Sequence, residues 1–151
     1  MSVQDYLDQM GVNYRLSRHD TAYTAADLAH VEHVPGRKVI KPVVIKADGQ
    51  FVMCALPASH RVDLDTLRCQ LQCNDVELAD EMDLAKIFPD CEVGAEPPFG
   101  ALYELPVYVS PILARDEEIT FNGGSHEEAI RMKYDDFARL TQPSIIHLSS
   151  E

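Results

Sequence analysis

Lys41 is the residue of this sequence whose surroundings most clearly suggest chemistry. It lies in segment 37–46, Arg-Lys-Val-Ile-Lys-Pro-Val-Val-Ile-Lys, whose apolar residues predict a β-strand. Because strand side chains alternate between faces, Lys41 shares a face with Val39, Val43 and Ile45. An ammonium among apolar neighbours is costly unless it reaches water, pairs with a carboxylate or is used for its charge. Taken alone, the pattern favours the first two explanations.

A second candidate is the loop 94–100, Gly-Ala-Glu-Pro-Pro-Phe-Gly. Its two glycines permit backbone conformations closed to other residues, and Pro97 and Pro98 stiffen the segment between them. Such a loop can grip a ligand through its backbone, with N–H donors on Gly94, Ala95, Glu96, Phe99 and Gly100. The competing interpretation is a plain surface connection.

A third candidate is the run Gly123-Gly124-Ser125-His126. The glycines allow a close backbone approach, and the histidine has the chemistry to hydrogen-bond a ligand or transfer a proton. The alternative is that Ser125 only stabilises a turn and His126 is its exposed neighbour. The sequence has no G-x-S-x-G elbow, P-loop or dinucleotide fingerprint, which disfavours the common hydrolase and nucleotide-binding classes.

The charge of the chain is unevenly distributed. A net charge of −12 disfavours non-specific binding to nucleic acid, because the protein repels a phosphate backbone. Residues 30–70 nevertheless carry six basic and four acidic residues, whereas residues 71–151 carry five basic and seventeen acidic ones. We therefore expect an anionic ligand to contact the middle of the chain.

Composition and cysteine spacing indicate an ordinary globular protein. The four cysteines form neither a disulfide framework nor a paired C-x-x-C zinc site, so we expect reduced thiols, no metal and no cofactor. No apolar run approaches the roughly 18 residues of a membrane span. The first residues lack the features of a signal peptide, which predicts a cytoplasmic location.

The elements that must position the candidate residues mix helices and strands. Capping residues and apolar spacing predict helices at 2–10, 24–33, 63–71, 80–88 and 135–140. Alternation predicts strands at 12–17, 37–46, 51–55, 76–78, 106–109, 118–121 and 129–132, with a hairpin turn at Asp48-Gly49. Without strict β-α alternation, an α+β or mixed α/β fold is favoured. We expect one domain, 1–151, with a loosely held tail after Pro143.

Taken in order, these motifs resemble the YbaK/EbsC family, free-standing relatives of the editing domain inserted into bacterial prolyl-tRNA synthetases. The resemblance covers about residues 20 to 140. It rests on Val34-Pro35-Gly36-Arg37, Lys41 with Val43-Val44, Leu56-Pro57 with Asp63-Leu64, Gly94-x-x-x-Pro98-Phe99-Gly100 and Gly124-Ser125-His126. The family fold that it implies is a mixed sheet curled towards a barrel, with flanking helices.

The resemblance implies a trans-acting aminoacyl-tRNA deacylase, which hydrolyses the ester joining a wrongly attached small amino acid to the terminal adenosine of tRNA. In that family the lysine matching Lys41 is essential, the loop lines the aminoacyl pocket and the histidine matching His126 helps to recognise the substrate. The implied substrate-binding set is Gly94, Ala95, Glu96, Pro98, Phe99, Gly100, Gly124, Ser125 and His126. Arg37, Lys38 and Lys46 would supply positive charge for the tRNA end, and an aminoacyl-tRNA synthetase is a further possible partner.

Two positions depart from the family pattern. Pro42 stands where relatives often carry a small hydroxyl residue, which removes any hydroxyl role there but favours an extended backbone at Lys41. Ser110 stands where many relatives carry aspartate. We expect this second change to alter the polarity of the pocket, and hence which amino acid is accepted.

Three functions are consistent with these residues. An aminoacyl ester is already activated, so positioning water and stabilising an oxyanion can suffice, and we expect Lys41 to act as a charged ammonium. A neutral Lys41 would act as general base only if burial lowered its pKa substantially. The first alternative is a module of the same fold that binds tRNA ends or a synthetase without hydrolysis. The second is an enzyme in which Lys41 forms a Schiff base with a carbonyl compound.

Overall fold

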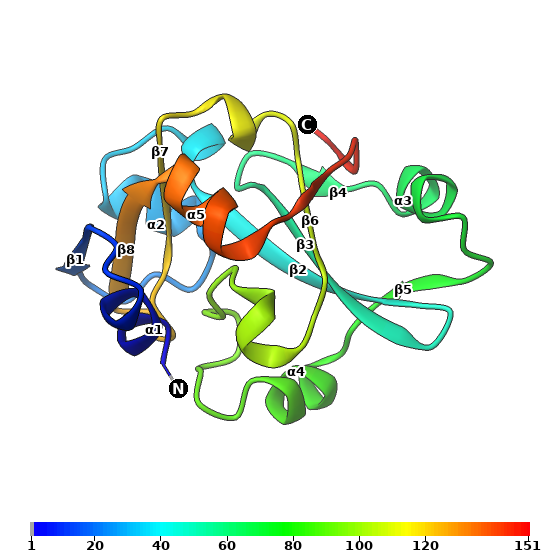
Figure 1. Cartoon of the computed structure of the whole chain (residues 1–151), viewed down its shortest axis with the longest axis horizontal. Coiled ribbons are helices and arrows are strands. Elements are labelled where there is room, and N and C mark those ends of the chain that lie inside the picture. Colours follow the sequence, from blue (N-terminus) through cyan, green and yellow to red (C-terminus); the bar gives the residue numbers. More distant parts are fainter. Residues whose placement is uncertain (1) are drawn as a thin grey trace.

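The computed structural model describes residues 2–151, with helices and strands mixed along the chain (Figure 1). The α-helices are α1 (Val3–Gln9), α2 (Ala25–Val31), α3 (Leu64–Leu71), α4 (Glu81–Ile87) and α5 (Tyr134–Thr141). Short 3-10 turns are η1 (Gly36–Lys38), η2 (Gly100–Tyr103) and η3 (Leu113–Arg115). The strands are β1 (Tyr14–Arg18), β2 (Ile40–Ala47), β3 (Gln50–Pro57), β4 (Arg61–Val62), β5 (Val76–Leu78), β6 (Val107–Val109), β7 (Glu118–Asn122), β8 (Glu128–Lys133), β9 (Ser144–Ile145) and β10 (Ser149–Ser150). The predicted mixed α/β class is confirmed.

The strands form three sheets. The largest has the order β5-β2-β3-β6-β9, in which β2 and β3 are a long antiparallel hairpin and β6 runs parallel to β3. The second sheet is β1-β8-β7, and β4 pairs with β10 in the third. An isolated bridge between Val39 and Thr120 joins the start of β2 to β7. The expectation of a barrel-like sheet is wrong in this respect, because the short strands β5 and β9 end the large sheet without closing it.

Capping residues begin the helices as predicted. The Thr24 side chain accepts a hydrogen bond from the Asp27 N–H at 3.0 Å, and Asp63 accepts one from the Thr66 N–H at 3.1 Å. Asp80 begins α4 with a reciprocal capping box. These bonds satisfy backbone donors that have no partner inside the helix, so each helix starts at a defined residue.

The β2–β3 hairpin forms where the Asp48-Gly49 pair predicts it. Both residues have positive φ angles, 47° and 85°, as the tight turns of two-residue hairpins require. The register opposes Ala47 to Gln50 and Lys41 to Leu56. The turn therefore determines which β3 residue lies beside each residue of β2, including Lys41.

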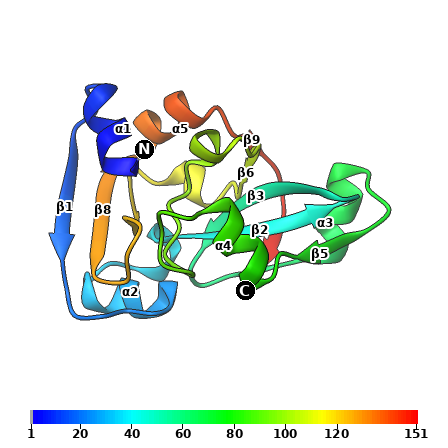
Figure 2. The same ribbon diagram turned by 90° about the horizontal axis from the view of Figure 1, so that it is seen from below.

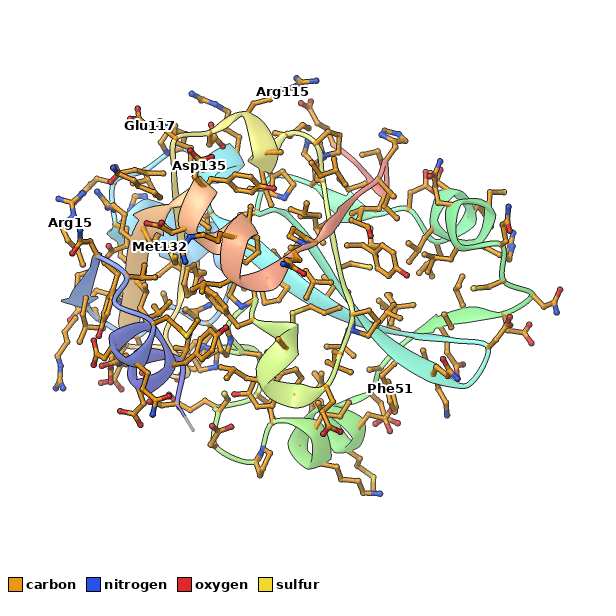
Figure 3. The ribbon with its side chains drawn as sticks, in the orientation of Figure 1. Arg15, Phe51, Arg115, Glu117, Met132 and Asp135 are labelled. Carbon is orange, nitrogen blue, oxygen red and sulfur yellow. The ribbon has the colours of Figure 1, made fainter. Side chains whose placement is uncertain are left out.

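The main core lies between the large sheet, the β1-β8-β7 sheet and the helices α1 and α5. Phe99 packs at its centre, with ring centroids 5.4 Å from Phe137, 5.6 Å from Phe121 and 6.0 Å from Tyr6. Figure 2 shows α1 and α5 on one side of the molecule and α2 on the other. Charged side chains extend outwards, as Arg15, Arg115 and Glu117 do in Figure 3. Within residues 2–151, no helix has the length and hydropathy needed to cross a membrane.

The tail after Pro143 is held by packing, contrary to the prediction. Its strands β9 and β10 pair with β6 and β4. Between them, Leu148 is fully buried in a second apolar cluster beneath α3, with Cys54, Leu56 and Leu67. The sequence interpretation missed this because the two strands are only two residues long and form through partners distant in the sequence.

We predict that Leu148→Ala lowers the free energy of unfolding by about 2–5 kcal/mol, the usual cost of truncating a buried leucine. Ile145→Ala is the matched control, since Ile145 lies in the same tail but is 56% exposed. Its expected effect is below about 0.5 kcal/mol. Urea unfolding of both variants measures the difference, and equal losses would contradict the packing role of the tail.

Candidate active site

Lys41 is the second residue of β2 and lies opposite Leu56 of β3. The predicted strand 37–46 is confirmed only from Ile40 onwards, because residues 36–38 form η1 and Val39 lies between the two elements. Within β2, Lys41 shares a face with Val43 and Ile45, as alternation predicts. Val39 packs in a buried cluster with Ala22, and Val43 lines a surface hollow together with Gly94. The Lys41 side chain is half-buried, and its Nζ donates a hydrogen bond to the main-chain carbonyl of His60.

No carboxylate compensates the charge of Lys41 within the described chain. The ion pairs found among residues 2–151 do not include it. Burial lowers the pKa of Lys41, and the positive charge of Arg61 lowers it further. Of the two explanations that the strand pattern favoured, reaching water or pairing with a carboxylate, the pairing is therefore wrong. The ammonium instead has a carbonyl on one side and a second cation nearby.

His60 contacts Lys41 but was not among the residues that the sequence pointed to. It is 7% exposed, and its Nδ1 lies 2.9 Å from the Ser149 hydroxyl of β10. This contact anchors the turn whose carbonyl receives Lys41. His60 and Ser149 are 89 positions apart, so no local pattern could reveal their pairing.

The loop that begins at Gly94 is bound to the Gly124–His126 run by the backbone. The Gly124 N–H donates to the Ala95 carbonyl at 3.1 Å, and the Glu92 N–H donates to the Gly124 carbonyl at 2.9 Å. Gly94 has φ 92° and touches the histidine ring, since a Cβ there would lie 3.3 Å from His126 Cε1. Two motifs about 30 residues apart in the sequence thus form one structural unit.

His126 is buried rather than an exposed neighbour of a turn. It is 7% exposed, and its Nδ1 and Nε2 lie 3.2 Å and 2.9 Å from the carbonyl oxygens of Ala22 and Val93. The Tyr23 ring lies 5.1 Å from the His126 ring and is 71% exposed. The unit therefore presents an aromatic face to solvent.

A surface hollow of about 180 Å³ lies along the edge of β2. This edge is open because β5 pairs only with residues 45–47 of β2. Residues from both faces of the strand therefore reach the hollow. Its lining is mainly apolar and consists of Pro42, Val43, Val44, Leu78, Ala79, Leu84, Gly94 and Glu96. Pro42 follows Lys41 in the strand, so the hollow begins one residue from the lysine, but Lys41 itself does not line it.

The predicted loop residues divide between lining the hollow and holding the loop. Gly94 and Glu96 line it, whereas Phe99 packs in the core and Gly100 packs against Leu105 and Val107. Ala95 and Pro98 are buried, and Ser125 accepts a turn hydrogen bond from the Glu127 N–H. The N–H groups of Gly94 and Ala95 bind Glu96 and the Glu92 carbonyl, so these two predicted donors are already occupied.

Ser110, the second departure from the family pattern, does not line this hollow. Its Oγ accepts a hydrogen bond from the Ile112 N–H at 3.2 Å, and the residue is 2% exposed. Ser110 therefore stabilises the turn that follows β6. Nothing in its contacts links it to the amino acid that the hollow would accept.

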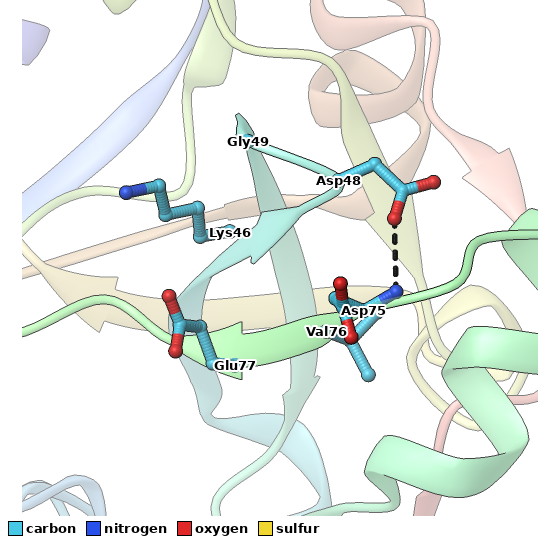
Figure 4. Close-up of a pocket in the computed structure, with 6 residues that line it drawn as sticks. All are labelled: Lys46, Asp48, Gly49, Asp75, Val76 and Glu77. Carbon is cyan, nitrogen blue, oxygen red and sulfur yellow. Dashed lines mark hydrogen bonds between the residues drawn. The ribbon is translucent and has the colours of Figure 1, made fainter.

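The three basic residues predicted to receive a tRNA end lie in two places. Arg37 and Lys38 lie in η1, directly before β2. Burial raises the pKa of Asp116, and the positive charges of Lys38 and Arg37 partly offset this rise. Lys46 lies at the far end of β2, opposite Glu77 in the register and beside a second hollow that Asp48 and Asp75 also line (Figure 4). Lys46 is five positions beyond Lys41 along the strand, a distance of roughly 16 Å. Arg61 is the additional cation that the fold brings to Lys41.

Comparison with known proteins gives this geometry its context. Residues 19–140 match the model of the aminoacyl-tRNA editing domain. The chain belongs to the aminoacyl-tRNA editing domain family. Editing domains remove a wrong amino acid from tRNA, so this member is a hydrolase of the deacylase type that acts on mischarged tRNA.

Individual relatives agree with this family. The chain is 26% identical to the Multifunctional Ser/Thr-tRNA deacylase ProXp-y of Escherichia coli K12, over 93% of this chain and 87% of the relative. The crystal structure of a hypothetical protein has TM-score 0.88 and 17% identity, covering 98% of this chain and 99% of that one. A proposed trans-editing enzyme for prolyl-tRNA synthetase has TM-score 0.87 and 18% identity, covering 99% and 95%. At these identities, the two structures show the fold alone.

Proposed function

We propose that this chain is a trans-acting deacylase whose reaction centre is Lys41 and whose aminoacyl pocket is the hollow beside it. The observation that carries this proposal is a half-buried lysine without a carboxylate partner, one residue along β2 from an apolar hollow. A cation in such surroundings is unfavourable for folding. Its natural use is to stabilise negative charge that appears only when a ligand binds or reacts.

The reaction that suits this site is hydrolysis by a bound water. Water attacks the ester carbonyl carbon, the bond to the ribose oxygen breaks, and the ribose hydroxyl and a free amino acid leave. The Lys41 ammonium stabilises the oxyanion that forms in between, and the partial burial of Lys41 strengthens this interaction. No serine or cysteine nucleophile is needed, because the ester is already activated and requires mainly orientation.

The remaining site residues would hold the substrate. Glu96 and Gly94 line the aminoacyl pocket, and His126 keeps the Gly94 end of the loop in place through its contact with Val93. Arg37, Lys38 and Arg61 supply positive charge at the Lys41 end of β2 for the phosphates of the acceptor end. Lys46, at the acidic far end of the hairpin, would make a weaker and more peripheral contact.

Two further aspects extend this proposal. A hollow of about 180 Å³ suits the side chain of a small amino acid. The relative named a Ser/Thr-tRNA deacylase supports a small aminoacyl group as the substrate. An aminoacyl-tRNA synthetase that releases the mischarged tRNA would be the partner, and the cytoplasm would be the place of the reaction.

The test is hydrolysis of a panel of aminoacylated tRNAs that carry different small amino acids. We expect loss of the ester from at least one mischarged pair and slow or no loss from correctly charged tRNAs. Binding of tRNA without hydrolysis of any pair would overturn the proposal in favour of a non-catalytic module.

The pH dependence of the reaction tests the charge of Lys41. Because the ammonium is the active form and its pKa is lowered, kcat/KM should fall as the pH rises through that lowered pKa. Arg61→Ala removes the repulsion that helps to lower the pKa, so the fall should move to higher pH. The measurement is kcat/KM from about pH 6 to about pH 10, with uncatalysed hydrolysis subtracted. A rising profile would indicate a neutral lysine acting as general base.

A further inference from the structure

Glu96 is the one ionisable group in the hollow, and its placement is unusual for a carboxylate. It is 5% exposed, although most glutamates lie on the surface. Its Oε1 accepts a hydrogen bond from the Gly94 N–H at 2.9 Å, which leaves Oε2 without a protein donor among residues 2–151. Oε2 is not one of the fully buried polar atoms that lack a partner, so it is open to the hollow that Glu96 lines, where a ligand donor can reach it.

The rest of the lining determines what kind of donor fits. Val43, Val44 and Leu84 are aliphatic and line the same hollow as the carboxylate. The hollow of about 180 Å³ is smaller than the roughly 300–1,000 Å³ of pockets for drug-sized ligands. A short side chain that carries one hydroxyl fits both features, because its carbon atoms meet the aliphatic wall while its O–H reaches Glu96.

We propose that Glu96 selects for a β-hydroxyl amino acid, serine or threonine, by accepting a hydrogen bond from the hydroxyl of the ester-linked residue. This inference rests on the proposed function and assigns its specificity to one oxygen, Glu96 Oε2. An alanyl or valyl group offers no donor, so binding it removes water from Oε2 without replacing the hydrogen bond. A site of this kind discriminates far more strongly than the size of the hollow alone.

The competing occupant of Glu96 is the α-ammonium of the same ester, which every amino acid carries. The two occupants respond differently to Glu96→Gln. The glutamine oxygen can still accept from the Gly94 N–H, and its NH₂ group can donate to a hydroxyl oxygen, but it cannot accept from an ammonium. Glu96→Gln should therefore retain part of the preference for serine, whereas Glu96→Ala should lose it.

The experiment measures kcat/KM for seryl, threonyl, alanyl and valyl esters of one tRNA. We expect the wild type to prefer the seryl and threonyl esters, and Glu96→Ala to lose about 10- to 100-fold on these two while alanyl hydrolysis changes by less than about threefold. Glu81→Gln on the exposed side of α4 is the control for a removed charge. Equal losses on all four esters, or no loss on any, would overturn the assignment.

A binding experiment distinguishes failure of the proposed role of Glu96 from failure of the proposed function. Non-hydrolysable 3′-seryl and 3′-alanyl amide analogues of adenosine can be titrated against wild type, Glu96→Ala and Glu96→Gln, with thermal unfolding to verify folding. Tighter binding of the seryl analogue that disappears in Glu96→Ala supports the role of Glu96 even if no ester is hydrolysed, a result that would contradict only the proposed function. Equal binding of both analogues to wild type contradicts the role of Glu96, whether or not esters are hydrolysed.

Discussion

Lys41→Ala is expected to lower kcat/KM for mischarged tRNA by at least about 100-fold while the protein stays folded. Losing one group that stabilises an oxyanion typically costs a factor of about 100 to 1,000 in rate. The variant should fold because its strand keeps the β3 register and because removing a half-buried cation relieves a desolvation cost. Single-turnover hydrolysis separates this chemical effect from weaker tRNA binding.

Two further variants make the result specific to Lys41. Lys133→Ala is the matched control, since Lys133 is an exposed lysine at the end of β8, and full activity is expected. Lys41→Arg keeps the positive charge but changes its shape, so partial activity would indicate an electrostatic role. If Lys41→Ala retained full activity, the reaction centre would have to lie elsewhere.

Gly100→Ala is expected to lower the free energy of unfolding by about 3 kcal/mol, the upper end of the cost of overpacking. An added Cβ would lie 2.6 Å from the Leu105 carbonyl oxygen and 2.6 Å from Val107 Cγ2. The first obstacle is backbone and is held in place, because the Leu105 N–H donates to the Gly100 carbonyl at 2.8 Å. The strain would also disturb Phe99, the adjacent residue at the centre of the aromatic core.

Thermal unfolding measures this effect, with an expected fall in Tm of roughly 6–12 °C for a chain of this size. Gly36→Ala is the control, because a Cβ there would meet only ordinary contacts, the nearest at 3.6 Å from Ser59 Cβ. A Gly100→Ala variant as stable as Gly36→Ala would show that the segment 100–105 can shift to make room. The loop residues Gly94 and Glu96 would then be less rigidly held than their contacts indicate.

Local sequence signals were sufficient for most of the secondary structure. Caps at Thr24, Asp63 and Asp80 and the Asp48-Gly49 turn depend on residues within a few positions of each other, so they can be read from the chain directly. The strand that carries Lys41, from Ile40 onwards, and the face that Lys41 shares with Val43 and Ile45 follow from alternation alone. The resemblance in motif order also identified the family that residues 19–140 match.

Tertiary structure decided what those local signals could not. The His60 turn that receives Lys41 depends on Ser149, and the tail that supplies Ser149 is held by the burial of Leu148. The hollow exists because β5 pairs with only part of β2. Glu96 lines this hollow, and its carboxylate accepts a hydrogen bond from the Gly94 N–H. The sequence by itself therefore determined the strand, the lysine and the family. The groups that surround Lys41 come from segments that are distant in the sequence. The energies of these contacts depend on burial, which no local sequence pattern specifies.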